Sequence, residues 1–259
     1  MIVDSHCHLD HFQGQEQDDV VARAKAAGVA TMVTIGTRLG EQAATVRAIA
    51  DRHDGVFATV GIHPHNAGER EAPTVAEILR EADHPKVIGI GESGLDYFYD
   101  KAPRPMQAES FRAHIAAARV SGLPLVIHSR DADDDMAAIL EDEAGQGAFP
   151  FLLHCFSSGA DLARLAVRLG GYVSFSGMLT FPKSDAIRAI AAETPADRLL
   201  VETDSPYLAP VPFRGKRCEP GYVVHTAAKL AEVRGLGIAA LAELTTGNFH
   251  RLFTRARAG

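Results

Sequence analysis

The stretch Met1-Ile2-Val3-Asp4-Ser5-His6-Cys7-His8-Leu9-Asp10 starts with apolar residues and ends with two histidines separated by one residue. Successive side chains of a β-strand point to opposite faces, so His6 and His8 share a face and Cys7 points away from it. Histidine is the commonest metal ligand, and two imidazoles at one strand end form half of a metal site. The alternative is two ordinary polar residues at a strand end, and ligands elsewhere in the chain decide between these interpretations.

Outward from this stretch, short apolar runs alternate with amphipathic segments along the whole chain. After the first strand, the predicted strands are residues 30–35, 56–60, 87–90, 124–127, 151–153, 172–175 and 199–201. The predicted helices are residues 18–27, 41–53, 75–82, 106–121, 132–143, 160–169, 184–192, 221–233 and 238–246, with a turn near 249–253. The hydrophobic period therefore switches between that of a strand and that of a helix in a regular order.

Strands that are continuous apolar runs are typical of a parallel sheet covered on both faces. Eight strand and helix units in a chain of 259 residues predict an α/β fold, the (β/α)8 TIM barrel, as a single domain over residues 1–259. A doubly wound open sheet is the alternative. The glycine-rich dinucleotide fingerprint of that class is missing after the first strand, and no linker or low-complexity segment marks a second domain.

Composition excludes several classes of protein. The three cysteines have no paired spacing, so we expect no disulfide framework and a reducing, cytoplasmic location. The chain starts with a strand rather than a signal peptide, and no run approaches the roughly 18 apolar residues of a transmembrane helix, so we expect no membrane partner. A net charge of −7 gives no general attraction to nucleic acid, so any anionic substrate must be held locally.

Residues that can bind metals follow almost every predicted strand. Active sites of TIM barrels lie at the carboxyl ends of the strands, where these side chains would meet. They are His6 and His8 after the first strand, then His63, His65, Glu92, His128, Arg130, His154, Glu202 and Asp204. Some have alternative roles: His65 as a loop cap, Glu202 as a residue that orients a ligand, and His63 as either a ligand or a substrate contact.

The cysteines are weaker candidates than the histidines. Cys7 lies between two histidines and Cys155 follows His154, so both should face the helices as core residues if their strands stay regular. Cys218 lies in a loop beyond the eighth strand, from which it could reach the site. A lone cysteine is weak support for a functional role.

A mixture of imidazoles and carboxylates suits Zn, Mn or Mg better than an all-sulfur site would. Four histidines with two carboxylates are more than one tetrahedral ion requires. We therefore expect two divalent metal ions, with Glu92 central enough to bridge them. The ligand types do not select among the three metals.

Eight ordered blocks of the sequence resemble the TatD family of metal-dependent deoxyribonucleases, within the amidohydrolase-like barrel superfamily. The resemblance covers nearly the whole chain. The blocks are DSHCHLD near the start, GIHPH at 61–65, GESGLDYFYD at 91–100, IHSRDA at 127–132, LHCFSSG at 153–159, ETDSPYLAP at 202–210, RGKRCEP at 214–220 and GNFHRLF at 247–253.

The resemblance implies roles for individual residues. The implied metal ligands are His6, His8 and Asp204 for one ion and His128 and His154 for the other, with Glu92 bridging. His63 and Arg130 would lie beside the scissile phosphate. A related branch of the superfamily bridges its metals with a carboxylated lysine, and Glu92 in that place favours the TatD branch. Cys218 stands where the family usually has asparagine, so a hydrogen bond from that amide is lost or replaced.

The predicted activity is hydrolysis of DNA phosphodiesters, trimming from the 3′ end as the family implies, with no obligate protein partner. We expect single-stranded ends as the substrate because they fit a recessed barrel mouth better than a duplex. Asp204 is the candidate to accept the proton of the attacking water, and Glu92 shares the catalytic centre. A local positive rim would hold the DNA. Its candidates are Arg130, Lys183, Arg214, Lys216 and Arg217, although exposed cations are often only solvated.

Other interpretations of the sequence remain open. Tyr97 and Phe98 would stack on a base or pack their loop against the barrel, and packing is favoured for at least one of them. The same metal site would also suit a deacylase that cleaves an aminoacyl ester of tRNA, because a Lewis acid polarises a carbonyl as readily as a phosphoryl oxygen. A third interpretation is a non-enzymatic scaffold whose ligands serve stability.

Overall fold

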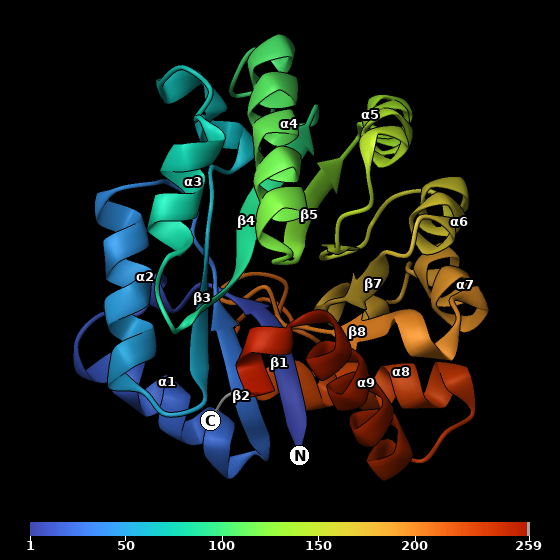
Figure 1. The fold of residues 1–259 in the computed structure, drawn as a ribbon. Helices are drawn as coiled ribbons and strands as arrows, with labels where there is room; N and C mark the ends of the chain where they lie inside the picture. The colour runs from blue at the N-terminus through green and yellow to red at the C-terminus, as the bar shows by residue number, and fades with distance from the viewer. Residues whose placement is uncertain (258–259) are drawn as a thin grey trace.

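The computed structural model describes residues 1–257 and contains a barrel of eight parallel strands in the order β1 to β8 (Figure 1). The strands are β1 Ile2–Cys7, β2 Val29–Thr34, β3 Val56–Val60, β4 Val87–Asp96, β5 Leu125–Arg130, β6 Phe151–Leu153, β7 Tyr172–Phe175 and β8 Leu199–Val201. Each strand pairs with the next strand along the chain. This is the TIM barrel that the sequence predicts, and the open-sheet alternative is wrong.

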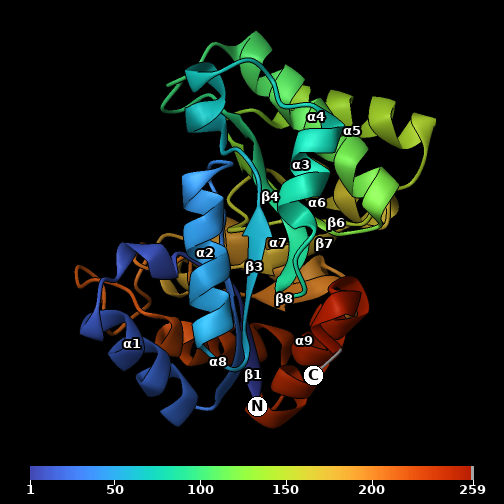
Figure 2. The same ribbon diagram turned by 60° about the vertical axis from the view of Figure 1, so that its left-hand side comes forward.

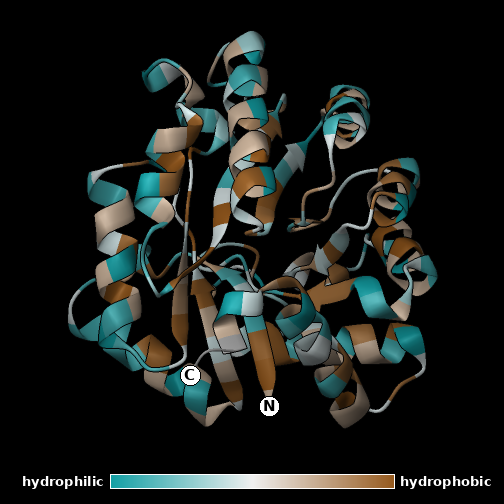
Figure 3. Ribbon diagram, in the orientation of Figure 1, coloured by the Kyte–Doolittle hydropathy of each residue, from teal (hydrophilic) through white to brown (hydrophobic). Residues whose placement is uncertain are grey.

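Helices alternate with the strands and surround the barrel (Figure 2). They are α1 Gln15–Ala26, α2 Glu41–Arg52, α3 Val75–Ala82, α4 Arg104–Ser121, α5 Asp133–Gln146, α6 Ala160–Arg168, α7 Asp185–Glu193, α8 Val223–Arg234 and α9 Ile238–Leu252. Figure 3 shows hydrophobic residues along the strands and hydrophilic residues on the outer faces of the helices. That distribution follows from burying both faces of a parallel sheet.

The barrel closes where β1 meets the segment that follows β8. The Asp204 N–H donates to the carbonyl of His6 at 2.9 Å, and the His8 N–H donates to the carbonyl of Ser205 at 2.7 Å. A parallel bridge between Cys7 and Ser205 lies beside these bonds. The closure therefore joins the two histidines of the first strand to the acidic segment of the last one.

Two apolar cores support this arrangement. The larger core lies between the strands and the surrounding helices, and the smaller one fills the barrel. Phe249 and Phe253 are fully buried in the smaller core together with Val3, Ile88 and Leu200. Helix α9 and the residue after it thus close the amino end of the barrel, which leaves the carboxyl end for a site.

Predicted and observed boundaries differ most at β4 and α9. Strand β4 continues to Asp96 instead of ending at residue 90, because Ser93 to Asp96 pair with Ile127 to Arg130 of β5 after a register shift. The predicted turn near residues 249–253 is mostly helix, since α9 runs through Gly247 to Leu252. Burial of Phe249 and Leu252 against the barrel outweighs the low helix propensity of that glycine.

Candidate metal centre

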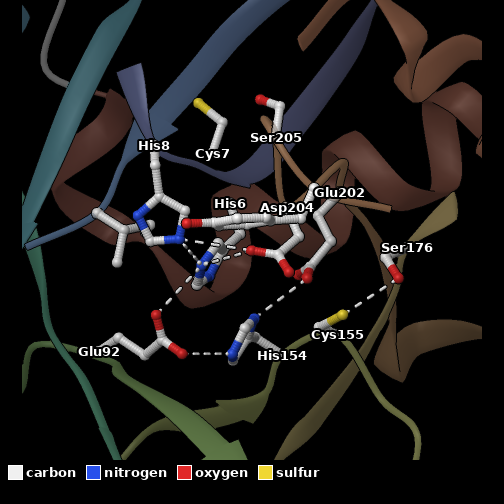
Figure 4. A network of polar contacts seen from close by, with 12 residues as sticks. His6, Cys7, His8, Glu92, His154, Cys155, Ser176, Glu202, Asp204 and Ser205 are labelled. Atoms are coloured by element: carbon white, nitrogen blue, oxygen red, sulfur yellow. Dashed lines mark hydrogen bonds and ion pairs between the residues drawn. The ribbon is translucent and has the colours of Figure 1, made fainter. Parts of the chain in front are cut away.

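Strand alternation carries polar side chains into the mouth of the barrel. Val126, Leu152 and Leu200 belong to the core inside the barrel. The residues two positions later on the same face are His128, His154 and Glu202. Figure 4 shows His154 and Glu202 meeting His6, His8, Glu92 and Asp204 at a common centre, with Cys7 directed away. The strands thus bring together the side chains that the sequence analysis selected.

One group of ligand atoms lies between β1 and the end of β8. The Nε2 atoms of His6 and His8 are 3.4 Å apart. Oδ1 of Asp204 lies 3.6 Å from Nε2 of His6 and 3.4 Å from Nε2 of His8. Oε2 of Glu92 completes the group at 3.4 Å from Nε2 of His6. Two imidazoles and two carboxylates therefore face one point.

A second group lies between β3, β5 and β6. Nδ1 of His128 and Nε2 of His154 are 3.4 Å apart. Oε1 of Glu92 lies 2.9 Å from the first of these nitrogens and 2.7 Å from the second. Nε2 of His63 lies 3.4 Å from the same oxygen. The two oxygens of Glu92 therefore face different groups of imidazoles.

The donor atoms fit divalent metal ions. A tetrahedral ion with bonds of about 2.0–2.1 Å keeps two ligand atoms roughly 3.3 Å apart, close to the separation within each histidine pair. His6, His8 and Glu92 form one cluster with ligand geometry, and His63, Glu92 and His128 form another. Buried imidazoles with carboxylates are the ligands of borderline divalent ions. The geometry also makes His63 a candidate ligand of the second ion.

Two further carboxylates contact the ring nitrogens of His154 and His128 that face away from Glu92, and so orient the rings. Oε1 of Glu202 lies 3.2 Å from Nδ1 of His154, the orienting arrangement considered for it above. Oδ2 of Asp96 lies 3.0 Å from Nε2 of His128 and 2.9 Å from Nε2 of His65. Asp96 is not among the site residues predicted from the sequence. It lies four residues after Glu92 on the same strand face, so a longer predicted β4 would have revealed it.

A buried carboxylate beneath the site was also missed. Asp4 accepts hydrogen bonds from the backbone N–H of Thr203 at 2.8 Å and from its hydroxyl at 2.6 Å. Burial raises the pKa of Asp4 to about 8. These bonds fix the segment that presents Asp204, whose backbone is left-handed with φ 57. Non-glycine residues in that region cost about 1–3 kcal/mol and collect at functional sites.

The charge states suit cation binding. Burial opposes ionisation of Glu92, but the surrounding His154, His63 and His128 hold its pKa well below the ordinary value. The pKa of Asp204 is likewise lowered, because its histidine neighbours outweigh burial. Burial lowers the pKa of His63 to about 4, so its imidazole is neutral. Ionised carboxylates and neutral imidazoles are the forms that bind metals. Burial lowers the pKa values of His8, His128 and His154, but their carboxylate neighbours outweigh it and raise them, so these imidazoles would release protons when an ion binds.

The predicted substrate contacts lie at the mouth with different partners. The Arg130 guanidinium lies 4.1 Å over the Phe98 ring, and that of Arg214 lies 4.1 Å over Phe181. Within residues 1–257 neither guanidinium forms an ion pair. Arg217, in contrast, pairs with Glu16 at 2.6 Å and is already neutralised.

The two predicted aromatic residues in the loop after β4 have different surroundings. Tyr97 packs against the outer core, and its hydroxyl donates to Oδ2 of Asp135 at 2.6 Å. Phe98 is 55% exposed. Packing therefore holds for Tyr97, while Phe98 stays available for contact.

The cysteines follow the predictions only in part. Cys7 is fully buried in the outer core. The prediction for Cys155 is wrong, because β6 ends at Leu153 and Cys155 has a left-handed φ of 43. Its Sγ points to the Ser176 hydroxyl at 3.2 Å (Figure 4). Cys218 is buried, with Sγ 3.9 Å from the carbonyl of Glu219.

Comparison with known proteins agrees with this geometry. Residues 3–254 match the family model described as TatD related DNase. The chain belongs to the TatD family. A TatD homologue from Escherichia coli K12, YJJV, shares its fold with a TM-score of 0.88 and 28% identity, over 98% of both chains.

Relatives in the TatD family are described as hydrolases. The metal-dependent hydrolase YabD of Bacillus subtilis is 40% identical over 98% of this chain and 99% of its own. A relative from Enterobacter lignolyticus, 36% identical over 92% of this chain and 93% of its own, is named 3'-5' ssDNA/RNA exonuclease TatD. This TatD-family chain is thus a metal-dependent hydrolase. Within residues 1–257 no helix has the length and hydropathy needed to span a membrane.

Proposed function

We propose that this hydrolase removes nucleotides from the 3′ end of single-stranded DNA, using two divalent ions bridged by Glu92. The observation that carries the proposal is the division of that carboxylate between two groups of imidazoles. Its Oε2 faces His6 at 3.4 Å, and its Oε1 faces His154 at 2.7 Å. Two adjacent ions of this kind are typical of enzymes that displace groups at phosphorus.

The ligands of each ion follow from the two groups. His6, His8 and Asp204 would hold one ion, and His128 and His154 the other, with Glu92 shared. Divalent ions held there supply Lewis acidity, which lowers the pKa of water and stabilises charge on a phosphate. Mg, Mn and Zn all suit these donors.

Asp204 is the proposed general base. Its side chain is 15% exposed, whereas the other members of its group are 8% exposed or less, so it faces the open mouth. Its lowered pKa keeps it ionised and able to accept a proton from water. Arg130, which has no acidic partner in the described chain, would hold the phosphate together with His63 and Arg214.

Three observations support DNA as the substrate. The exonuclease relative from Enterobacter lignolyticus acts on single-stranded nucleic acid by its name. The ligand groups lie at the carboxyl end of the barrel and are mostly buried, which suits a flexible strand end better than a rigid duplex. The unpaired guanidiniums at the rim supply the local positive charge that the net charge of −7 does not.

The test is release of label from a 3′-labelled single-stranded oligonucleotide. Metal-stripped protein refilled with Mg, Mn or Zn is compared with Glu92→Ala, with an aminoacyl ester as second substrate. We expect metal-dependent release that Glu92→Ala abolishes. If folded, metal-loaded protein cleaves the ester and not the DNA, the deacylase activity would replace the nuclease activity as the proposed function. Full activity in Asp204→Asn would show that Asp204 is not the general base.

We also propose that residues 1–259 form one domain that works in a reducing, cytoplasmic compartment without an obligate protein partner. Helix α9 packs against both β1 and β8, so the chain beyond the barrel belongs to the same body. The final two residues lie outside the described part. All three cysteines are free, as a reducing compartment requires.

A further inference from the structure

Exposed aromatic rings gather at the mouth of the barrel. Among the phenylalanines and tyrosines of residues 1–257, the strongly exposed ones are Phe98 at 55%, Tyr99 at 52% and Tyr207 at 51%. The first two follow β4, and Tyr207 follows β8. Large apolar rings left in water on one face indicate a binding surface.

Phe98 and Tyr99 form one platform with Arg130. The guanidinium lies 4.1 Å from the centre of the Phe98 ring and 4.8 Å from that of Tyr99. The two rings meet edge to face at 4.9 Å. The Lys101 ammonium also lies 5.6 Å from the centre of the Tyr99 ring. Because Arg130 has no ion pair in the described chain, this platform offers cations for a phosphate, and its half-exposed rings offer aromatic surface for a base.

This platform adjoins the second group of metal ligands. The Tyr99 ring lies 5.3 Å from that of His65, and His65 lies 4.4 Å from His63. His63 in turn lies 4.7 Å from His128. A continuous row of rings therefore leads from Tyr99 to one side of the site.

Tyr207 forms a platform on the other side. Its ring lies 6.1 Å from His8 and 5.8 Å from His11, and its N–H donates to the Asp204 carbonyl at 2.9 Å. It therefore adjoins the first group of ligands. In an eight-stranded barrel with strands in sequence order, β4 and β8 are diametrically opposite, so the ligand groups lie between the two platforms.

We propose that the two platforms stack nucleobases on either side of the scissile phosphate, which makes unpaired bases, and not only the phosphate, the feature recognised. This inference rests on the proposed nuclease function and extends it. Stacking accepts every base, so we expect little sequence preference. In a base-paired end only the outer face of the terminal pair is free to stack, so two bases cannot reach the two platforms, and we expect single strands to be preferred.

The test compares Tyr99→Ala and Tyr207→Ala with Val120→Ala, an exposed apolar residue of α4 away from the mouth. Three substrates are used: a single-stranded oligonucleotide, the same oligonucleotide with abasic residues at its 3′ end, and methyl 4-nitrophenyl phosphate. We expect each tyrosine substitution to raise the KM for the normal oligonucleotide about tenfold or more, as loss of one stacked base does. Tyr99→Phe and Tyr207→Phe should restore it.

The other substrates separate the possible outcomes. On abasic DNA the alanine variants should match the wild type, and on the small diester kcat should not change. Unaltered KM on normal DNA, or an equal loss on abasic DNA, would overturn the stacking proposal while leaving the nuclease intact. A wild type that hydrolyses neither the small diester nor DNA would instead overturn the proposed function itself.

Discussion

At the level of single residues, Asp96 binds two imidazoles through one carboxylate oxygen. Replacing it by asparagine keeps the shape but removes the charge that orients His128 at 3.0 Å. Loss of such an orienting partner weakens metal binding about 10- to 100-fold. We expect Asp96→Asn to lose affinity for one of the two ions, as measured by calorimetric titration with Mn or Zn.

A matched control is Asp197→Asn, which changes a carboxylate that is 62% exposed and lies 3.9 Å from Arg198. It should bind both ions as the wild type does. Two unaltered binding steps in Asp96→Asn would show that His128 keeps its position without this carboxylate.

His114 holds the loop that carries His63 through a buried hydrogen bond, and its protonation should make the free energy of unfolding depend on pH. Its Nε2 accepts the N–H of Ile62 at 3.0 Å, and burial lowers its pKa from 6.5 to about 4. The unfolded chain therefore takes up a proton below pH 6.5, while the folded protein does so only near pH 4. The free energy of unfolding should fall by about 3 kcal/mol over that interval.

Urea titrations of metal-free protein at pH 7.5, 5.5 and 4 measure this loss. His114→Gln should be less stable at neutral pH, because a buried hydrogen bond is disturbed, and should lack this part of the pH dependence. Parallel pH curves for the variant and the wild type would place the titrating group elsewhere.

The sequence could predict the side chains that follow strict alternation. His6, His8, His128 and His154 each lie at a strand end, where parity decides the face. Asp4 was not predicted because it lies inside β1, and Asp96 was not predicted because the predicted fourth strand ended at residue 90. Their partners Thr203 and His128 come from distant parts of the chain. The alternation of side chains could not predict the direction of Cys155, because β6 ends at Leu153 and Cys155 itself has a left-handed backbone.

At the level of elements, β4 depends on glycine beyond the predicted strand end. Gly94 has φ +147, and a methyl group there would overlap the carbonyl oxygen of its β5 partner His128. We expect Gly94→Ala to lower the free energy of unfolding by about 2–4 kcal/mol and to weaken metal binding. Thermal and urea unfolding measure the first effect.

Gly145→Ala is the matched control, since Gly145 lies in helix α5 and a methyl group there meets nothing within 4 Å. It should leave stability equal or up to about 1 kcal/mol higher, because alanine favours a helix. Equal stability of both variants would mean that β4 adjusts its backbone around the new methyl group.

The order of the elements could be predicted better than their ends. Residues 151–153 are wholly apolar and residues 172–175 are apolar or aromatic except for Ser174, and the structure has the same bounds for β6 and β7. Strand β4 continues through Glu92, Gly94 and Asp96, whose composition is unlike that of a buried strand. The proposed metal centre would account for this difference, because it needs polar groups where the core would need apolar ones.

At the level of the whole molecule, the ligands come from strands distributed around the barrel. Bound ions would therefore stabilise the complete fold and not one local segment. At a concentration a hundred times the Kd, binding contributes about 2.7 kcal/mol. For a protein of this size we expect removal of the ions with a chelator to lower Tm by roughly 5–10 °C for each bound ion.

The shift should be much smaller in Glu92→Ala and should persist in His84→Ala, which changes a histidine paired with Asp51 outside the ligand groups. A chelator effect of the same size in Glu92→Ala would show that the stabilising ion binds elsewhere.

Because the barrel closes between β1 and the segment after β8, it can be completed only after that segment has been synthesised. His6 and Asp204 are joined by a backbone hydrogen bond, yet they leave the ribosome about 200 residues apart, which corresponds to roughly 10–40 s of translation. Until the second of them emerges, the growing chain has its first histidines but lacks the carboxylate that completes their group. A chain that ends before Asp204 would carry His6, His8, Glu92, His128 and His154 without this carboxylate, so we expect it to be inactive.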